Sequence, residues 1–300
     1  MQNLRKLSRA GLALFTALLI LGVYSLAAAA ENVNSIYDTE TSSNVENQTE
    51  SHGITSATLT VDYWAGYISD TESIATAPFH WQASDWGKAA LVLGIASVFY
   101  MKDSEIRDWS QDHRSDAGDS IAKVAKHFGG NIVLLPLSAL YLYGYESDDL
   151  RARRTALLGL ESFIETTFIT ASLKYMGQRS RPYTGDPYDT WDGIGLSGDN
   201  DYLSFPSTHA ARAFSIATII AEEYKDRPFV PILSYSLATL TALSRINDDE
   251  HWASDVFVGS AIGYFTAKAI LARHPVDGES WTVLPTTDGK SIGLGVRYQF

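Results

Sequence analysis

Apolar residues at helical spacing alternate with short polar segments from about residue 84 to residue 273. The first apolar stretch follows Ser84 and Asp85, which are typical N-cap residues, and continues to Tyr100. Further stretches cover residues 131–145, 151–177, 210–224, 229–243 and 251–273. Their length and periodicity predict an all-α fold, a helical bundle of about six main helices.

Charged residues divide the apolar runs of these helices. The runs extend for about 11 to 15 residues before a charge or a proline, whereas a membrane-spanning helix needs about 20. Charged residues within or beside the runs are Glu161, Glu165, Glu222, Glu223 and Lys268. The pattern favours a water-soluble bundle with buried core helices, and a compact integral membrane bundle is the alternative.

The pattern changes after Arg273. Residues 281–284 and 291–300 are rich in β-forming side chains and flank the hairpin-type dipeptide Asp288-Gly289. We therefore expect a small C-terminal β-hairpin that covers one end of the bundle. Residues 58–63 alternate in polarity and predict one more short strand.

The chain begins with a positively charged segment that contains Arg5, Lys6 and Arg9. An almost wholly apolar run, 11–26, follows and ends at the small residues 27–30. This order is typical of a secretory signal peptide and predicts export to the periplasm. An uncleaved anchor is the alternative, because the run reaches about 20 residues when the small residues are included.

Four regions follow from these patterns: a signal peptide (1–30), a polar and partly disordered leader (31–82), a helical domain (83–275) and the C-terminal hairpin (276–300). The 300 residues carry a formal net charge of −12, which makes nucleic acid a poor partner. There is no cysteine, so disulfides, Cys–zinc sites and thiol catalysis are excluded.

Three polar clusters interrupt the apolar helices. The first holds Lys174, Arg179 and Arg181 at the end of the longest predicted helix, which Pro182 stops. Arg presents a planar fork that matches pairs of phosphate oxygens, and Lys supplies a point charge. Arg179 could take part or remain solvated. Alone, such cations usually only compensate the dipole at a helix C-terminus.

The second cluster, Pro206 to His209, lies directly before an apolar helix. Ser207 or Thr208 is a suitable N-cap, and the free backbone N–H groups at that point form an anion site. His209 falls in the first turn, where a general acid could protonate a leaving-group oxygen. By itself, such a sequence usually signifies capping alone.

The third cluster joins Ser244 and Arg245 to His251 and Asp255. His251 and Asp255 are four residues apart, so we expect them on one face at the start of a helix. A carboxylate there can hold one imidazole nitrogen and leave the other nucleophilic. A surface ion pair near the helix start is the alternative.

In this order, the three clusters resemble the type 2 phosphatidic acid phosphatase family, whose superfamily includes bacterial non-specific acid phosphatases and vanadium haloperoxidases. The resemblance implies that Lys174, Arg181 and Arg245 bind phosphate oxygens. Ser207 and the backbone of Thr208 would complete the phosphate site. Members of the family often have glycine where this chain has Thr208, so we expect a tighter pocket wall there.

The same resemblance implies the catalytic roles. His251 would attack phosphorus and form a phosphohistidine, while Asp255 would orient His251. His209 would protonate the leaving alcohol and later activate water. With three fixed cations at the transferring group, no metal or cofactor is required.

The expected protein is therefore an exported phosphatase that acts on phosphate monoesters or diphosphates. Its substrate would be a phosphorylated small molecule or lipid, and it would associate with a membrane surface. One alternative is an integral-membrane lipid phosphatase of the same family. A vanadate-dependent haloperoxidase and a catalytically idle envelope protein are two further alternatives.

Overall fold

The computed structural model describes residues 71, 74, 76–274, 280–287 and 292–299. The predicted signal peptide (1–30), the strand at 58–63 and most of the predicted leader lie outside the described residues. The four-region division of the chain therefore stays a prediction.

The described part of the chain is helical up to His274, which confirms the all-α prediction. The helices are α3 (Ala83–Met101), α4 (Asp103–Asp112), α5 (Asp116–Ala125), α6 (Leu134–Glu146), α7 (Leu150–Gly177), α8 (Thr208–Glu223), α9 (Phe229–Asn247) and α10 (Ala253–Arg273). Short 3₁₀ turns are η2 (Ala77–His80), η3 (Lys126–Gly129), η4 (Asn131–Val133), η5 (Pro182–Thr184) and η6 (Asn200–Tyr202). Pro136 lies in the first turn of α6, where a missing N–H is tolerated.

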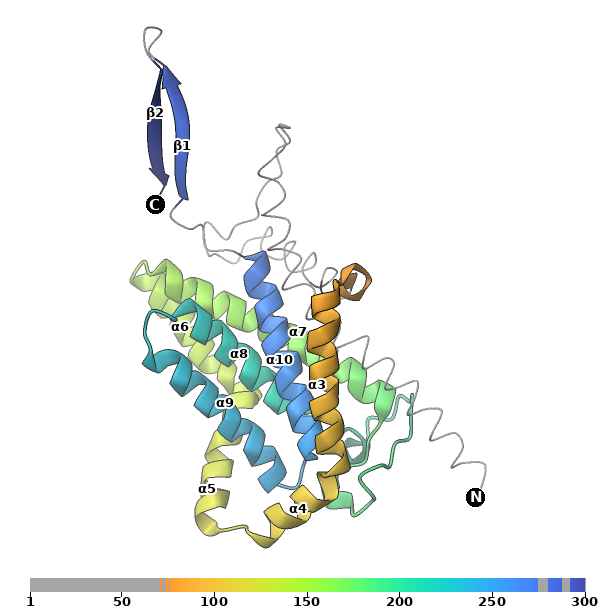
Figure 1. The fold of residues 1–300 in the computed structure, drawn as a ribbon. Coiled ribbons are helices and arrows are strands. Elements are labelled where there is room, and N and C mark those ends of the chain that lie inside the picture. The colour runs from red at the N-terminus through yellow and green to blue at the C-terminus, as the bar shows by residue number, and fades with distance from the viewer. Residues whose placement is uncertain (1–70, 72–73, 75, 275–279, 288–291, 300) are drawn as a thin grey trace.

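Helix α8 packs against α7, α9 and α10, and it forms the centre of the bundle. Figure 1 shows α3 beside α10, and α4 and α5 at the end of the bundle where α9 ends and α10 begins. The largest core cluster joins Leu158 of α7, Ile219 of α8 and Ile262 of α10, all of which are buried. This core fixes the helix ends that carry the polar clusters.

Two glycines allow the backbones of α8 and α10 to touch. A Cβ at Gly259 would overlap the carbonyl group of Ser207, and one at Gly263 would overlap that of Ala211. Only glycine removes this clash, because any larger residue places its Cβ against the neighbouring backbone. The contact fixes the start of α8 against the first turns of α10.

Within the part of the chain that the structure describes, three helices are long and apolar enough to cross a membrane: α7, α9 and α10. This finding favours the membrane bundle over the water-soluble bundle that we expected from the short apolar runs. The charges that divide the longest helix do not face outward, because Glu161 and Glu165 are each only 1% exposed. The apolar surface of the helix is therefore longer than its apolar runs in the sequence.

The last part of the chain contains two strands, β1 (Ser280–Thr287) and β2 (Ile292–Gln299). They pair in antiparallel register, with Val283 opposite Val296. Residues 288–291, between the two strands, lie outside the described residues. The C-terminal hairpin and its place on the bundle therefore stay a prediction.

Candidate active site

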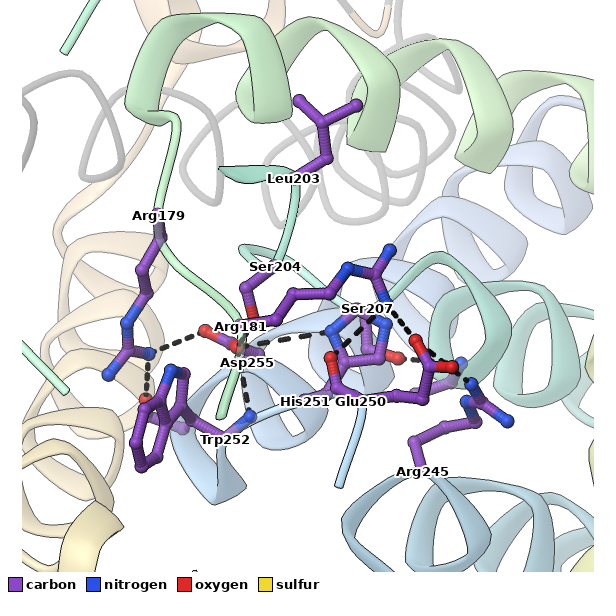
Figure 2. Close-up of polar contacts among 12 residues, drawn as sticks. Arg179, Arg181, Leu203, Ser204, Ser207, Arg245, Glu250, His251, Trp252 and Asp255 are labelled. Carbon is purple, nitrogen blue, oxygen red and sulfur yellow. Dashed lines mark hydrogen bonds and ion pairs between the residues drawn. The ribbon is translucent and has the colours of Figure 1, made fainter. Parts of the chain in front are cut away.

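Three segments that are far apart in the sequence meet in one place (Figure 2). They are the chain after α7, the start of α8, and the connection from α9 to α10. Ser204 N donates to the Arg179 carbonyl at 3.0 Å, and Ser207 N donates to the Asp255 carbonyl at 3.0 Å. The three predicted polar clusters are thus brought together into one site.

His251 lies in the connection between α9 and α10 and not in a helix. The prediction that His251 and Asp255 share the start of one helix is therefore wrong. Asp249 has a positive φ of 58°, and extended Trp252 is the N-cap of α10. Asp255 still faces the imidazole, because Asp255 Oδ2 lies 3.9 Å from His251 Nδ1. His251 Nδ1 has no hydrogen-bond partner among the described residues. The carboxylate is near enough to orient the ring electrostatically.

Asp255 is fully buried and held by three donors. Its Oδ2 accepts from Trp252 N at 3.0 Å and from Ser204 Oγ at 2.5 Å. Its Oδ1 accepts from Arg179 Nη1 at 2.5 Å. These bonds fix the carboxylate with Oδ2 toward His251, which is the orientation that a positioning carboxylate needs.

Arg179 and Asp103 form a buried ion pair that the sequence analysis did not find. Both side chains are 0% exposed, and Arg179 Nη2 lies 2.7 Å from Asp103 Oδ2. The guanidinium carbon also lies 4.9, 5.1 and 5.4 Å from the ring centroids of Tyr100, Trp191 and Trp252. Arg179 is therefore not solvated, and its charge is shared between two carboxylates.

Ser254 closes this network. Its hydroxyl accepts from Arg179 Nη1 at 2.8 Å and donates to Asp103 Oδ2 at 2.5 Å, while its backbone N–H donates to Asp103 Oδ1 at 2.9 Å. Helix α4 is thereby tied to the start of α10. The motif contained Arg179, but nothing in the sequence linked it to Asp103 in a distant helix.

The cationic cradle is the name we give to Lys174, Arg181 and Arg245. Lys174 Nζ donates to the carbonyl of Leu203 and, at 3.3 Å, to that of Ser204, so it reaches from α7 to the chain before α8. Arg181 and Arg245 are buried, and both lie beside Glu250 (Figure 2). The charges of Arg245, Lys174 and Arg181 all act on His209 in the first turn of α8, so the three cations lie near the predicted anion site.

The start of α8 has the expected cap. Ser207 Oγ accepts from Ala210 N at 3.4 Å, which makes Ser207 the N-cap, and Thr208 is the first helical residue. Thr208 Oγ1 donates to Thr170 Oγ1 at 3.0 Å, so this side chain is held toward α7. The first N–H groups of a helix have no partner within it, and they can bind an anion.

His209 follows in the first turn and is covered by the η3–η4 connection. A Cβ at Gly129 would overlap the His209 carbonyl, and a Cβ at Gly130 would lie 3.8 Å from His209 Nε2. Glycine is therefore required for the close approach at position 129. The sequence offered no clear sign that this turn would form a wall of the site.

Both histidines are held in the neutral form. Burial lowers the pKa of His251 well below its usual range, and the charges of Lys174 and Arg181 act in the same direction against the nearby Asp255. Burial also lowers the pKa of His209 to about 3, helped by Arg245 and other cations. Charges of the cradle therefore act on both imidazoles.

No group of three or more His, Asp or Glu side chains is arranged to hold a metal ion within the residues that the structure describes. The site instead offers three cations, helix N–H groups and two neutral imidazoles. Such a set suits a tetrahedral oxyanion with more than one negative charge. That the reaction needs no metal remains a prediction from the sequence.

The fold is a helical bundle, and its site brings cations, helix N–H groups and two histidines together. Comparison with known proteins adds a match to one family. Residues 155–278 match the family model of the PAP2 superfamily. This match confirms the resemblance to the family that the motifs of the chain show.

Two relatives are lipid phosphatases by name. Lipid A 1-phosphatase of Porphyromonas gingivalis is 46% identical over 108 residues, which are 32% of this chain and 24% of that protein. Lipid A 4′-phosphatase of Helicobacter pylori is 31% identical over 106 residues, 34% of this chain and 52% of that protein. The matches thus span about a quarter and about half of these relatives.

Among solved structures, Aquifex aeolicus LpxE is 23% identical, with a TM-score of 0.44. The likeness covers 57% of this chain and 93% of that one.

Proposed function

We propose that this protein is a membrane phosphatase that hydrolyses a lipid phosphate monoester through a phosphohistidine. The observation that carries the proposal is the placement of His251. It is buried, its Nδ1 faces Asp255 Oδ2 at 3.9 Å, and it lies beside cations from two other segments. The PAP2 match and the names of the relatives support phosphate ester chemistry.

The first step transfers the phosphoryl group to the protein. The Nε2 atom of His251 attacks phosphorus, and a P–N bond forms as the bond from phosphorus to the alcohol oxygen breaks. His209 donates a proton to that oxygen. Burial and the nearby cations lower the pKa of His209 in the free site, whereas the negative charge of a bound phosphate acts in the opposite direction and favours the protonated ring that this step needs.

The second step releases phosphate. Water attacks phosphorus while neutral His209 takes its proton, an O–P bond forms, and the P–N bond breaks. His251 leaves as the neutral imidazole, with Asp255 stabilising the transient positive charge on the ring. Lys174, Arg181 and Arg245 bind the charge on the transferring group in both steps.

Exposed apolar side chains near the site support a lipid substrate. A groove of about 310 Å³ runs between α4, α5 and α9, lined by Trp109, Ile121 and Leu243 among others. Ser244, which also lines the groove, precedes Arg245 of the cradle in the sequence. Only 33% of the most apolar 18-residue stretch of α9 is buried, so much of this helix faces outward. An apolar surface beside an anion site fits a phosphate that is attached to hydrocarbon.

Phosphate release tests this proposal. The purified protein in detergent with EDTA should release phosphate from a phospholipid monoester in mixed micelles at a higher kcat/KM than from p-nitrophenyl phosphate. The lipid should be preferred because only it can occupy the apolar surface. Equal rates with the two substrates would argue for a soluble substrate, and loss of release in EDTA would contradict a metal-independent reaction.

A further inference from the structure

Glu250 places a carboxylate between two arginines of the cradle (Figure 2). Its Oε2 accepts a hydrogen bond from Arg181 Nη1 and lies 3.7 Å from Arg245 Nη2. The residue directly precedes His251 in the chain. A protein carboxylate therefore contacts the two guanidinium groups that are proposed to bind phosphate.

The donors of Arg181 are almost completely engaged in this arrangement. Nε donates to Asn200 O at 2.8 Å and Nη2 donates to Asn200 Oδ1 at 2.9 Å. Nη1 donates to the carbonyl of Glu250 at 3.2 Å as well as to its carboxylate. A guanidinium has five N–H groups, and these bonds use four of them. Two-point binding of phosphate by Arg181 thus requires a partner to leave.

Arg245 has the opposite arrangement. Its Nη1 donates to Asp248 Oδ2 at 3.1 Å, while its buried Nε has no hydrogen-bond partner among the described residues. Nε and Nη2 form one edge of the guanidinium fork, and Glu250 lies against Nη2. If the carboxylate leaves, this edge can bind two oxygens of a phosphate.

The backbone of Glu250 is anchored, but its side chain can turn. The N–H of Glu250 donates to Arg245 O at 3.1 Å, and the carboxylate of neighbouring Asp249 accepts two hydrogen bonds from Arg107, each of 2.7 Å. The Glu250 side chain is 32% exposed, so rotation into solvent is open to it. Displacement therefore requires no movement of His251.

We propose that Glu250 is an internal competitor of phosphate, which occupies the cradle and must be displaced by substrate. The inference rests on the proposed phosphatase function. The carboxylate offers Arg181 and Arg245 the charge and the oxygen that a phosphate would offer. It weakens the binding of substrate and of product phosphate alike, and so speeds product release.

The test compares wild type, Glu250→Gln and Glu250→Ala with the control Glu222→Gln. Glu222 is also an ion-paired glutamate, 36% exposed against 32% for Glu250, but it lies at the far end of α8 and pairs with Lys268. Inorganic phosphate is the probe, as a competitive inhibitor of turnover. Both Glu250 variants should bind phosphate about tenfold more tightly, with a similar fall in KM, and the control should match wild type.

The outcomes separate the two proposals. Unchanged or weaker phosphate binding in active Glu250→Gln and Glu250→Ala variants would overturn the competitor role, since Glu250 would then only position the arginines. Thermal unfolding would show that the variants are folded. If wild type and every variant neither hydrolyse phosphate esters nor bind phosphate, the phosphatase function itself fails and the inference fails with it.

Discussion

At the scale of single residues, the site depends on how buried charges are paired. Asp255 faces His251 and shares Arg179 with Asp103, so we expect a change at one member to affect the others. The motifs predicted the residues at the centre of this arrangement. They could not predict Asp103, because burial and pairing arise only when α4 packs against α10.

Arg179 is a positioning residue in this account. Arg179→Lys keeps one positive charge but loses the fork that bridges two carboxylates. We expect kcat to fall by about 10²-fold, the usual effect of a displacement of about 1 Å, with little change in KM. Steady-state kinetics check this, with exposed Arg114→Lys as the matched control. A rise in KM with an unchanged kcat would instead place Arg179 in substrate binding.

The pH dependence should reflect the neutral nucleophile. Because the pKa of His251 is lowered, the imidazole stays neutral as pH falls through the ordinary histidine value of about 6.5. The loss of kcat/KM that is due to His251 should therefore begin below that pH. Two substrates with different phosphate pKa values separate this loss from titration of the substrate. A substrate-independent loss at or above about 6.5 would contradict a neutral buried nucleophile.

At the scale of elements, the sequence predicted the helices well and their junctions less well. The predicted stretch 151–177 became α7 almost unchanged, because a long apolar pattern ends at Gly177. The segment 102–119 contributes to α4 and α5, which the six main predicted helices did not include. His251 was expected in a helix, but the positive φ of Asp249 turns the chain and delays the start of α10 to Ala253.

The close contact between helices α8 and α10 can be tested by a single substitution. Gly263→Ala places a methyl group against the Ala211 carbonyl, so the helices must separate. We expect a loss of about 1–3 kcal/mol in stability, and lower activity because His209 moves with α8. Gly94→Ala in α3 is the control, since its Cβ would meet nothing within 4 Å. Denaturation and activity in detergent check both, and equal stability of the two variants would contradict the close packing.

At the scale of the whole molecule, the sequence favoured a soluble bundle for a reason that the fold explains. The positions of charged residues along a helix sequence do not reveal whether their side chains face the core or the surface. Glu161 and Glu165 divide the apolar run of α7, yet both are buried within the bundle. Helices α7, α9 and α10 are therefore apolar enough to cross a membrane, although α7 carries these two carboxylates.

Membrane extraction tests this placement. The expressed chain should remain in the membrane pellet after an alkaline carbonate wash and be released only by detergent, because α7, α9 and α10 can each span a bilayer. A protein that is bound only to the membrane surface would be released by the wash. Recovery in the wash would contradict the membrane bundle.

The central claim is that His251 becomes covalently phosphorylated. The most direct measurement is rapid quenching with p-nitrophenyl phosphate that carries labelled phosphorus. We predict a protein-bound label that is stable in alkali and labile in acid, as expected for a P–N bond. The label should be absent from His251→Ala and retained in the control His113→Ala, whose histidine is exposed on the end of α4.

His209→Ala sharpens this measurement. The p-nitrophenolate leaving group needs no proton, so the label should still form, and it should persist longer because water is not activated. Label of equal size in His251→Ala and wild type would contradict the account. So would turnover in wild type without any trapped label.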